Sequence, residues 1–203
     1  MTTTLWVVLG YLVGSVPFAF LITRASGRVD IRQLGSGNVG AANVLRVAGS
    51  RAALMTALFD IAKGAAVVLT ARAAGAAPGV CASVGAAAVG GHIYPIWLRF
   101  RGGKGVATTC GVFAVLAPLA TLLAAVMFAG VVRATRRVSL GSMAAAVSLG
   151  PLAYAVGTPN TAVRAAFFSG CLILFNHRSN LIRLAGGTEA RLGDDVPRRG
   201  DAP

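Results

Sequence analysis

A glycine-rich segment with one lysine carries the clearest chemical signal in this sequence. The run Gly-Gly-Lys-Gly at 102–105 follows Arg101 and directly precedes an apolar run. Backbone N–H groups in such turns and at helix N-termini bind anions, and a lysine adds a full positive charge. The pattern predicts a phosphate site. It is not a nucleotide-binding P-loop, because Leu98 stands where that motif needs glycine and no Ser or Thr follows Lys104, so ATP hydrolysis is not indicated.

A second polar segment lies at 30–46. Glycines at 35, 37 and 40 allow close backbone approach to a ligand, and Ser36, Asn38 and Asn43 offer short polar groups. Arg46 is suited to a bidentate contact with phosphate. The alternative is an ordinary loop whose glycines serve turns. The combination favours a binding loop.

Two further segments contribute candidates. In 176–189, a helical conformation places His177 near Asn180, and Asn180 near Arg183, each at a spacing of three residues. Glu189 is the sole glutamate, and we expect it to pair structurally with an arginine. The other segment, 137–142, contains two serines. Ser139 suits a helix N-cap, and Ser142 could face a polar cavity.

The elements that must position these groups are membrane helices. The 203 residues are 56% hydrophobic and 12% charged, with a mean hydropathy of +0.73. The apolar residues form long runs rather than alternating patterns, which indicates a polytopic integral membrane protein with an all-α fold. The run from Leu5 to Ile22 reads as a first span and not as a cleavable signal. The apolar runs lie near 5–22, 54–70, 79–98, 106–132, 140–156 and 162–175.

The placement of positive charge predicts the topology. The formal net charge is +13, and 16 of the 19 basic residues fall in four segments, 24–51, 99–104, 133–137 and 178–199. This distribution argues against nucleic acid as a partner, and the positive-inside rule places all four segments in the cytoplasm, with the N-terminus outside. Segments 99–104 and 133–137 share a side only if 106–132 crosses twice, so we expect Ala117-Pro118 to divide it into two short helices. That gives seven spans and a cytoplasmic C-terminus; the rival is one long tilted helix and six spans.

The chain is expected to form one transmembrane domain over residues 1–188. Residues 189–203 are polar and contain proline, so we expect a disordered cytoplasmic tail. The three cysteines show no metal-ligand spacing and read as small apolar residues, and no metal site is expected. Asp60 and Lys63 lie three residues apart inside one span, where mutual pairing is the preferred interpretation over direct chemistry. His92 is interpreted as a structural hydrogen-bonding group.

Several runs together resemble one family. They are Gly35-Ser-Gly-Asn-Val-Gly-Ala-Ala-Asn, Gly91-His-Ile-Tyr-Pro, Gly102-Gly-Lys-Gly-Val-Ala-Thr, Val138-Ser-Leu and Asn180-Leu-Ile-Arg-Leu-Ala-Gly-Gly-Thr-Glu. In order and type they are similar to the motifs of the bacterial acyl-phosphate:glycerol-3-phosphate acyltransferases, the PlsY family, over roughly residues 5–192. Two positions depart from the family pattern: Ala42 stands where threonine is usual and Ile93 where asparagine is usual. The usual threonine and asparagine side chains are therefore not essential in this protein, or other residues have taken over their roles.

The resemblance implies an enzyme of phospholipid synthesis. It would transfer a fatty acyl group from acyl phosphate to the sn-1 hydroxyl of glycerol 3-phosphate, giving lysophosphatidic acid and phosphate, with no cofactor. We expect a monomer in the bacterial inner membrane, with its active site facing the cytoplasm. The residues implied as catalytic are Ser36, Arg46, Lys104, His177 and Asn180. The expected substrate-binding residues are Gly35, Gly37, Asn38, Asn43, Gly102, Gly103, Gly105, Thr108 and Ser142, and Glu189 is expected to be structural.

Two points remain open at the level of sequence. The proton acceptor is either His177 or an oxygen of a substrate phosphate, and we favour an orienting role for the histidine. A membrane transporter of organic phosphates could use the same basic, glycine-rich cavity. It would need an access path through the protein and polar residues in several spans, which are scarce apart from Asp60 and Lys63. A metal-dependent phosphotransferase is nearly excluded, because it needs a cluster of aspartates.

Overall fold

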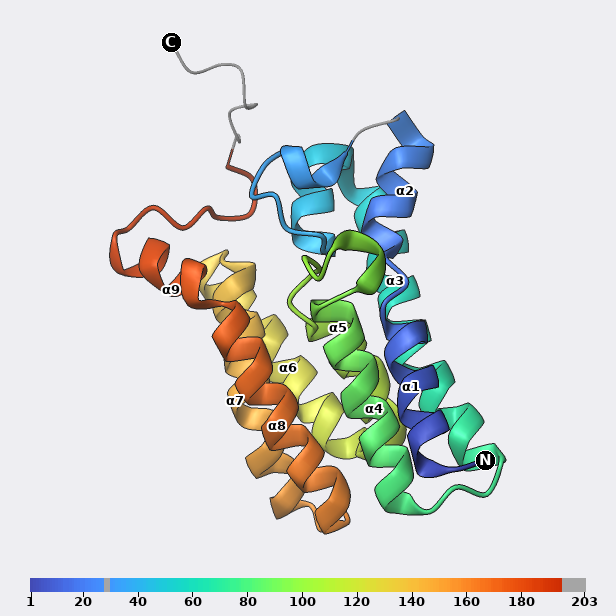
Figure 1. Ribbon diagram of the computed structural model, residues 1–203. Helices are drawn as coiled ribbons and strands as arrows, with labels where there is room; N and C mark the ends of the chain where they lie inside the picture. The colour runs from blue at the N-terminus through green and yellow to red at the C-terminus, as the bar shows by residue number, and fades with distance from the viewer. Residues whose placement is uncertain (28–29, 195–203) are drawn as a thin grey trace.

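The computed structural model describes residues 1–27 and 30–194, and its regular structure in that part of the chain is helical (Figure 1). This confirms the all-α expectation. The α-helices are α1 (Thr3–Gly14), α2 (Phe18–Gly27), α3 (Ala41–Ala73), α4 (Pro78–Ile93), α5 (Val106–Leu116), α6 (Pro118–Thr135), α7 (Val138–Ala155), α8 (Asn160–Asn176) and α9 (Arg178–Ala185). Two short 3-10 helices are η1 (Ile31–Gln33) and η2 (Ile96–Leu98).

Five helical stretches are long and apolar enough to cross a membrane: Thr3–Gly27, Ala41–Ala73, Pro78–Leu98, Pro118–Thr135 and Val138–Ala155. The first of them combines α1 and α2, and it includes the span expected at 5–22. The shorter α5 is also apolar. Since a helix needs about 20 apolar residues to cross the hydrocarbon core, the expected total of seven crossings stays a prediction.

The chain breaks at Ala117-Pro118, as the proline predicts. Ala117 leaves the helical conformation, with φ −150° and ψ 65°, and its N–H donates to the Phe113 carbonyl at 2.8 Å. The first half, α5, has 11 residues and rises only about 16 Å. The second half, α6, has 18 residues and rises about 27 Å, because the helix continues past the apolar run to Thr135. The expectation of two short helices is therefore right for α5 and wrong for α6.

Two other helical stretches bend where the sequence provides a reason. Between α1 and α2, Pro17 lacks an N–H, and the Ser15 hydroxyl donates back to the Tyr11 carbonyl at 2.8 Å. Within α3 the backbone turns at Gly49, whose φ of 83° lies in the left-handed region that favours glycine. The kink separates residues 41–48, which include the end of the polar segment at 30–46, from the membrane-spanning part of α3.

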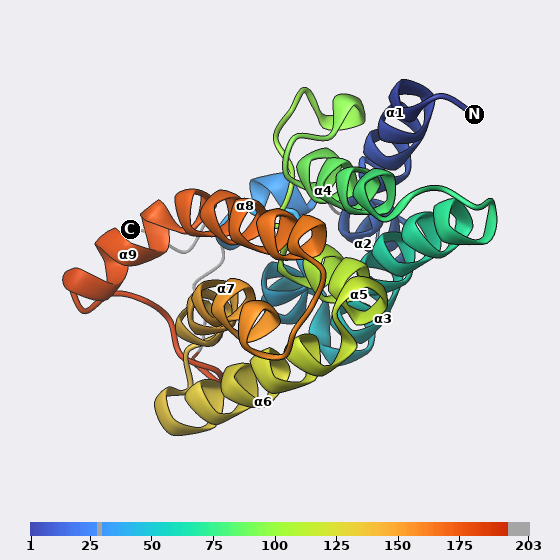
Figure 2. The same cartoon turned by 90° about the horizontal axis from the view of Figure 1, so that it is seen from below.

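Small residues let the central helices approach closely. Helix α4 packs against α1, α3, α5 and α8, while α6 and α7 pair beside them (Figure 2). Gly14 in α1 faces the backbone of Ala88 in α4, and Gly111 in α5 faces the backbone of Ile61 in α3. A Cβ at either glycine would overlap the facing helix, so these contacts depend on glycine, as is common where membrane helices pack.

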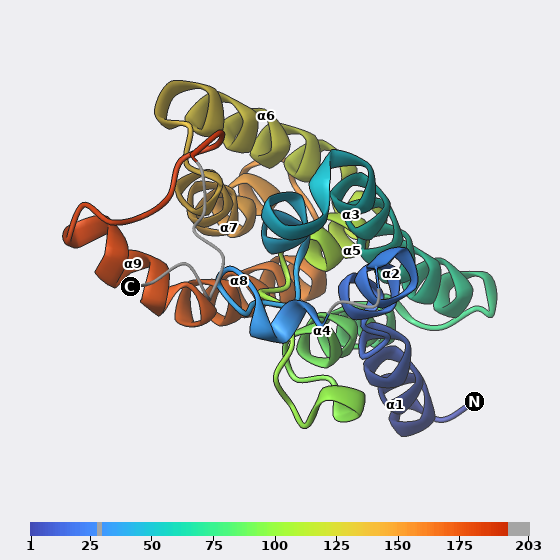
Figure 3. The same cartoon turned by 90° about the horizontal axis from the view of Figure 1, so that it is seen from above.

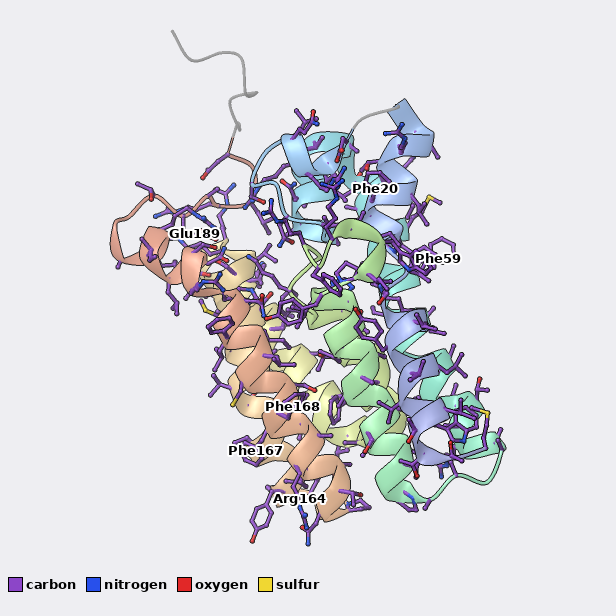
Figure 4. The ribbon with its side chains drawn as sticks, viewed as in Figure 1. Phe20, Phe59, Arg164, Phe167, Phe168 and Glu189 are labelled. Atoms are coloured by element: carbon purple, nitrogen blue, oxygen red, sulfur yellow. The ribbon has the colours of Figure 1, made fainter. Side chains whose placement is uncertain are left out.

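The polar segments gather at one end of the bundle. Seen from that end (Figure 3), the loop around η1 lies between α2 and the α8–α9 junction. Figure 4 places Glu189 at this end and Arg164 at the opposite one, with Phe167 and Phe168 on the side of the bundle between them. Both phenylalanines are half exposed, at 50% and 53%, as expected for side chains that face lipid.

The segment after α9 returns to the bundle. The Leu192 N–H donates to the Arg136 carbonyl at 2.7 Å, and the Arg136 guanidinium donates to the Leu192 carbonyl at 2.6 Å. Of the tail expected at 189–203, residues 189–194 are thus part of the described structure, with Glu189 buried. Residues 195–203 lie outside the described residues.

Candidate active site

The loop before α3 is folded around the side chain of Asn43. Asn43 lies in the first turn of α3 and is 2% exposed. Its Nδ2 donates to the carbonyls of Leu34 and Asn38 at 3.0 and 3.1 Å, and its Oδ1 accepts from the Ser36 N–H at 3.0 Å. The side chain is buried behind the loop with its amide occupied. Asn43 organises the loop that presents Ser36 and Asn38, and its expected contact with substrate stays a prediction.

Two glycines complete this loop. Gly35 and Gly37 have φ values of 56° and 71°, and a Cβ on Gly35 would meet the Asn43 amide oxygen. Gly37 also lines the cavity described below. Arg46, one turn after Asn43, is exposed and does not line that cavity, although it lies near enough to Lys104 to affect its charge.

In the glycine-rich loop, the first two N–H groups are not available to an anion. The Gly102 N–H donates to the Ile93 carbonyl at 3.0 Å, and the Gly103 N–H donates to the His92 carbonyl at 3.1 Å. Gly105 adopts a left-handed φ of 87° and caps the N-terminus of α5. Gly102 and Gly103 therefore hold the loop tightly against the end of α4. The cations that the loop places at the cavity described below are the side chains of Arg101 and Lys104.

Three hydroxyl groups of the predicted site lie apart from the cavity. Thr108 is fully buried and faces Gly64 of α3, and Ser142 is buried within α7. Neither lines the cavity. The expectation that Ser139 caps α7 is wrong, because α7 begins at Val138 and its N-cap residue is Arg137.

A hydrogen-bonded chain joins Lys104 to the C-terminal segment. The Lys104 ammonium donates to Oδ1 of Asn180, and Nδ2 of Asn180 donates to Glu189 at 2.6 Å. Arg183 donates through Nε to the other carboxylate oxygen of Glu189 at 2.7 Å. Glu189 thus holds the Asn180 amide and the Arg183 guanidinium beside each other, one on each carboxylate oxygen. The Asn180 amide can present its oxygen to Lys104 only because its nitrogen is held by the carboxylate.

The η1 loop, the glycine-rich loop and the α8–α9 junction line an open cavity of about 490 Å³. Each of the three segments contributes polar groups to its wall. The lining residues are Asp30, Arg32, Gln33, Ser36, Gly37, Asn38, Arg101, Gly102, Lys104, Asn176, Ser179 and Arg183. Asp30 is neutralised by Arg32, whose Nη2 lies 2.7 Å from the carboxylate. The cavity wall therefore carries the uncompensated charge of Arg101 and Lys104, and Arg183 shares its charge with Glu189.

Burial shifts the pKa values of the ionisable groups next to the cavity. It lowers the pKa of Lys104 to about 8, with Arg183 and Arg46 adding to the effect and Glu189 opposing it. Burial also lowers the pKa of His177 to about 4, and the nearby Lys104 charge acts in the same direction. Burial opposes ionisation of Glu189, but hydrogen-bond donors that include Asn180 and Arg183 bring its pKa below the usual value. At neutral pH the set is therefore a lysine cation, a neutral histidine and a carboxylate.

His177 has a defined tautomer. It is 2% exposed at the junction of α8 and α9, and its Nδ1 lies 2.8 Å from the Ile173 carbonyl oxygen. A carbonyl only accepts, so Nδ1 carries the proton and Nε2 carries the lone pair. The ring is then fixed in orientation and can accept a hydrogen bond through Nε2.

Seven lining residues were not among the site residues predicted from sequence: Asp30, Arg32, Gln33, Arg101, Asn176, Ser179 and Arg183. The last three share one signal. Asn176, Ser179 and Arg183 follow one another at spacings of three and four, the period of one helix face. That periodicity was the available signal. It continues across the α8–α9 junction, which brings all three to the same wall. The described residues contain no cluster of three His, Cys, Asp or Glu side chains that could hold a metal ion.

The fold and the site together define an integral membrane protein with a basic cavity at one end of a helical bundle. Residues 4–187 match the family model described as glycerol-3-phosphate acyltransferase. The chain belongs to that family, as the sequence motifs predicted.

Individual relatives agree over nearly the whole chain. A glycerol-3-phosphate acyltransferase of Myxococcus xanthus is 49% identical, over 94% of this chain and all of the relative. One from Thermus thermophilus is 46% identical, over 98% of this chain and all of the relative. Two crystal structures of PlsY (YgiH), an integral membrane glycerol 3-phosphate acyltransferase, also match. The glycerol 3-phosphate form has a TM-score of 0.89 and the lysophosphatidic acid form 0.87; both are 36% identical, and they cover 94% of this chain and 96% and 95% of their own.

Proposed function

We propose that the cavity binds glycerol 3-phosphate and that the protein transfers a fatty acyl group to it from an acyl phosphate. The observation that carries this proposal is the convergence of three separate segments on Lys104, within a chain of the glycerol-3-phosphate acyltransferase family. The related PlsY structures, one a glycerol 3-phosphate form and one a lysophosphatidic acid form, support the substrate and the product. They also favour acyl transfer over the alternative of phosphate transport.

The charge of the cavity suits two phosphorylated substrates. Each phosphate monoester carries about −1.5 to −2 charges near neutral pH. Two unit charges 4 Å apart interact by roughly 4 kcal/mol at an effective dielectric constant of 20, so their approach needs cations. Lys104, Arg101 and Arg183 line the cavity and can supply them, with Arg46 nearby. Ser36, Asn38 and Asn176 offer hydrogen bonds to the glycerol hydroxyls.

The reaction is a direct acyl transfer. The sn-1 hydroxyl oxygen of glycerol 3-phosphate attacks the carbonyl carbon of the acyl phosphate, and the bond from that carbon to the phosphate oxygen breaks. The hydroxyl proton passes to a phosphate oxygen, so lysophosphatidic acid and inorganic phosphate leave. His177, whose pKa near 4 makes it a weak base at neutral pH, is buried and does not line the cavity, so we give it an orienting role at the α8–α9 junction and not that of proton acceptor. Because acyl phosphate is already activated, positioning and charge stabilisation supply most of the acceleration.

The same reasoning gives a topology. Three of the four basic segments contribute to the cavity wall, through Arg32, Arg101, Lys104 and Arg183. Arg136 of the fourth bonds to Leu192, three residues after Glu189, which lies at the same end, whereas Arg164 lies at the opposite end (Figure 4). By the positive-inside rule the cavity end faces the cytoplasm of a bacterial inner membrane, the N-terminus is outside, and seven segments cross. The convergence of three segments of one chain on the cavity supports a monomer.

The proposal is tested with purified protein in detergent micelles. Acyl phosphate and labelled glycerol 3-phosphate are added without metal or coenzyme A, and lysophosphatidic acid and phosphate are measured. We expect equal amounts of both products. Release of phosphate without lysophosphatidic acid, or no product, would overturn the proposal. Uptake of labelled glycerol 3-phosphate into vesicles without acylation would favour the transporter.

A further inference from the structure

Three buried polar side chains form a cluster beneath the glycine-rich loop. Lys63 and Asp60 lie on α3 and are 5% and 2% exposed. The Lys63 ammonium lies 2.7 Å from Oδ1 of Asp60, 2.8 Å from the Val16 carbonyl oxygen and 3.0 Å from Nδ1 of His92. An ammonium has three N–H groups, so three partners satisfy it. The cluster joins the break between α1 and α2, the middle of α3 and the end of α4.

The cluster reaches the predicted phosphate loop through His92. The main-chain carbonyl of His92 accepts the Gly103 N–H, and the His92 ring approaches Gly103 so closely that a Cβ there would overlap Nε2. One narrow cleft is lined by Asp60, Lys63, His92 and Gly103 together. The next residue is Lys104. The orientation of the His92 ring, fixed by Lys63, therefore helps to determine where the backbone before Lys104 lies.

The location of this cluster argues for a role beyond holding helices together. Helix α3 is long and apolar enough to span the membrane, and charged groups within such a helix are costly to bury. The neighbouring contact of α3 with α5 is made by small residues and needs no charge. A buried ion pair can often be replaced by apolar side chains without loss of stability. What apolar side chains cannot provide is the directed hydrogen bond to the His92 ring.

We infer that Lys63, held by Asp60, is a positioning residue that fixes His92 and, through Gly103, places the Lys104 ammonium for phosphate binding. The inference rests on the proposed function of the cavity. None of the three side chains lines the cavity. Loss of the cluster displaces the loop, so it weakens glycerol 3-phosphate binding while leaving the acyl phosphate chain contacts intact.

The first test uses the double variant Asp60→Leu/Lys63→Met, which removes both charges together and leaves neither one unpaired. The control is Thr56→Val, which deletes a fully buried hydroxyl on the same helix that bonds only within α3, to Ala52. Steady-state kinetics with each substrate varied in turn are combined with melting temperatures. We expect the KM for glycerol 3-phosphate to rise about tenfold in the double variant. The KM for acyl phosphate is expected to stay within twofold, and the control to match the wild type.

The result that would overturn the inference is a folded, active double variant with unchanged KM for glycerol 3-phosphate, which would make the cluster structural only. If the double variant does not fold, His92→Leu decides, because it leaves Lys63 paired with Asp60 and Val16. The same selective rise in KM is expected there, and an unchanged KM overturns the inference. The wild type in the same assay separates the two proposals: if it forms no lysophosphatidic acid, the proposed function fails, whereas an active wild type with unaffected variants contradicts only the positioning role.

Discussion

Replacement of Lys104 by methionine tests the site most directly. Methionine keeps an unbranched apolar stem and removes the ammonium that donates to Asn180. At pH 7 this ammonium is charged, because its pKa is lowered only to about 8. A hydrogen bond to a charged group contributes about 1.5–3 kcal/mol. The loss corresponds to a rise of about 10- to 150-fold in the KM for glycerol 3-phosphate.

The assay follows phosphate release and lysophosphatidic acid formation at pH 7 with glycerol 3-phosphate varied. Arg133→Met is the matched control, because Arg133 is an exposed cation on α6 that does not line the cavity. A general loss of positive potential would affect both variants alike, whereas a direct contact affects only the Lys104 variant. A KM for Lys104→Met within threefold of wild type, or a rise equal to that of the control, would refute the assignment of this lysine to the phosphate.

Three further predictions follow from the pKa values and the buried amide. The KM for glycerol 3-phosphate should be constant from pH 6.5 to 7.5 and rise above pH 8, by up to about tenfold per pH unit, because Lys104 must then take up a proton to bind phosphate. The Lys104→Arg variant should abolish the rise. A flat wild-type profile up to pH 9.5 would contradict this prediction. His177 has a pKa near 4 in the folded protein against 6.5 normally, so the unfolded state binds more protons between these values. Stability should therefore fall as pH decreases from 6.5 to 4, by about 3 kcal/mol, and His177→Gln should flatten this part of a melting-temperature profile; equal slopes would be evidence against the buried neutral ring. Asn43→Ala should destabilise the loop by about 3 kcal/mol and lower both melting temperature and activity; a variant as stable and active as wild type would show that the amide does not organise the loop.

The sequence predicts the helical class and the break at Pro118 because both depend on local properties, apolar length and a missing N–H. Of the residues it names as catalytic, Ser36 and Lys104 line the cavity and Asn180 accepts a hydrogen bond from Lys104. The length of α6 was missed because Arg133 ends the apolar run while the helix continues to Thr135. Charge at a helix end does not stop the helix.

The surroundings of single groups depend on other properties. Whether an N–H is free depends on which carbonyl it meets, and the carbonyls that bind Gly102 and Gly103 are presented by the end of α4 after the chain turns through η2. Asn43 is a suitable ligand by type, yet the start of α3 at Ala41 turns its amide into the loop. These outcomes depend on tertiary geometry, which residue type and spacing alone do not encode.

The kink at Gly49 has a mechanical consequence. No atom lies within 4 Å of a Cβ built at this glycine, so the left-handed torsion, and not crowding, is what requires it. Residues 41–48 then form a lever arm about 12 Å long, pivoted at one residue. Asn43, which anchors the loop, lies six residues from the pivot, so a change of about 20° there corresponds to roughly 3 Å at Asn43. The position of the Ser36 loop at the cavity is therefore sensitive to the torsion angles of one glycine.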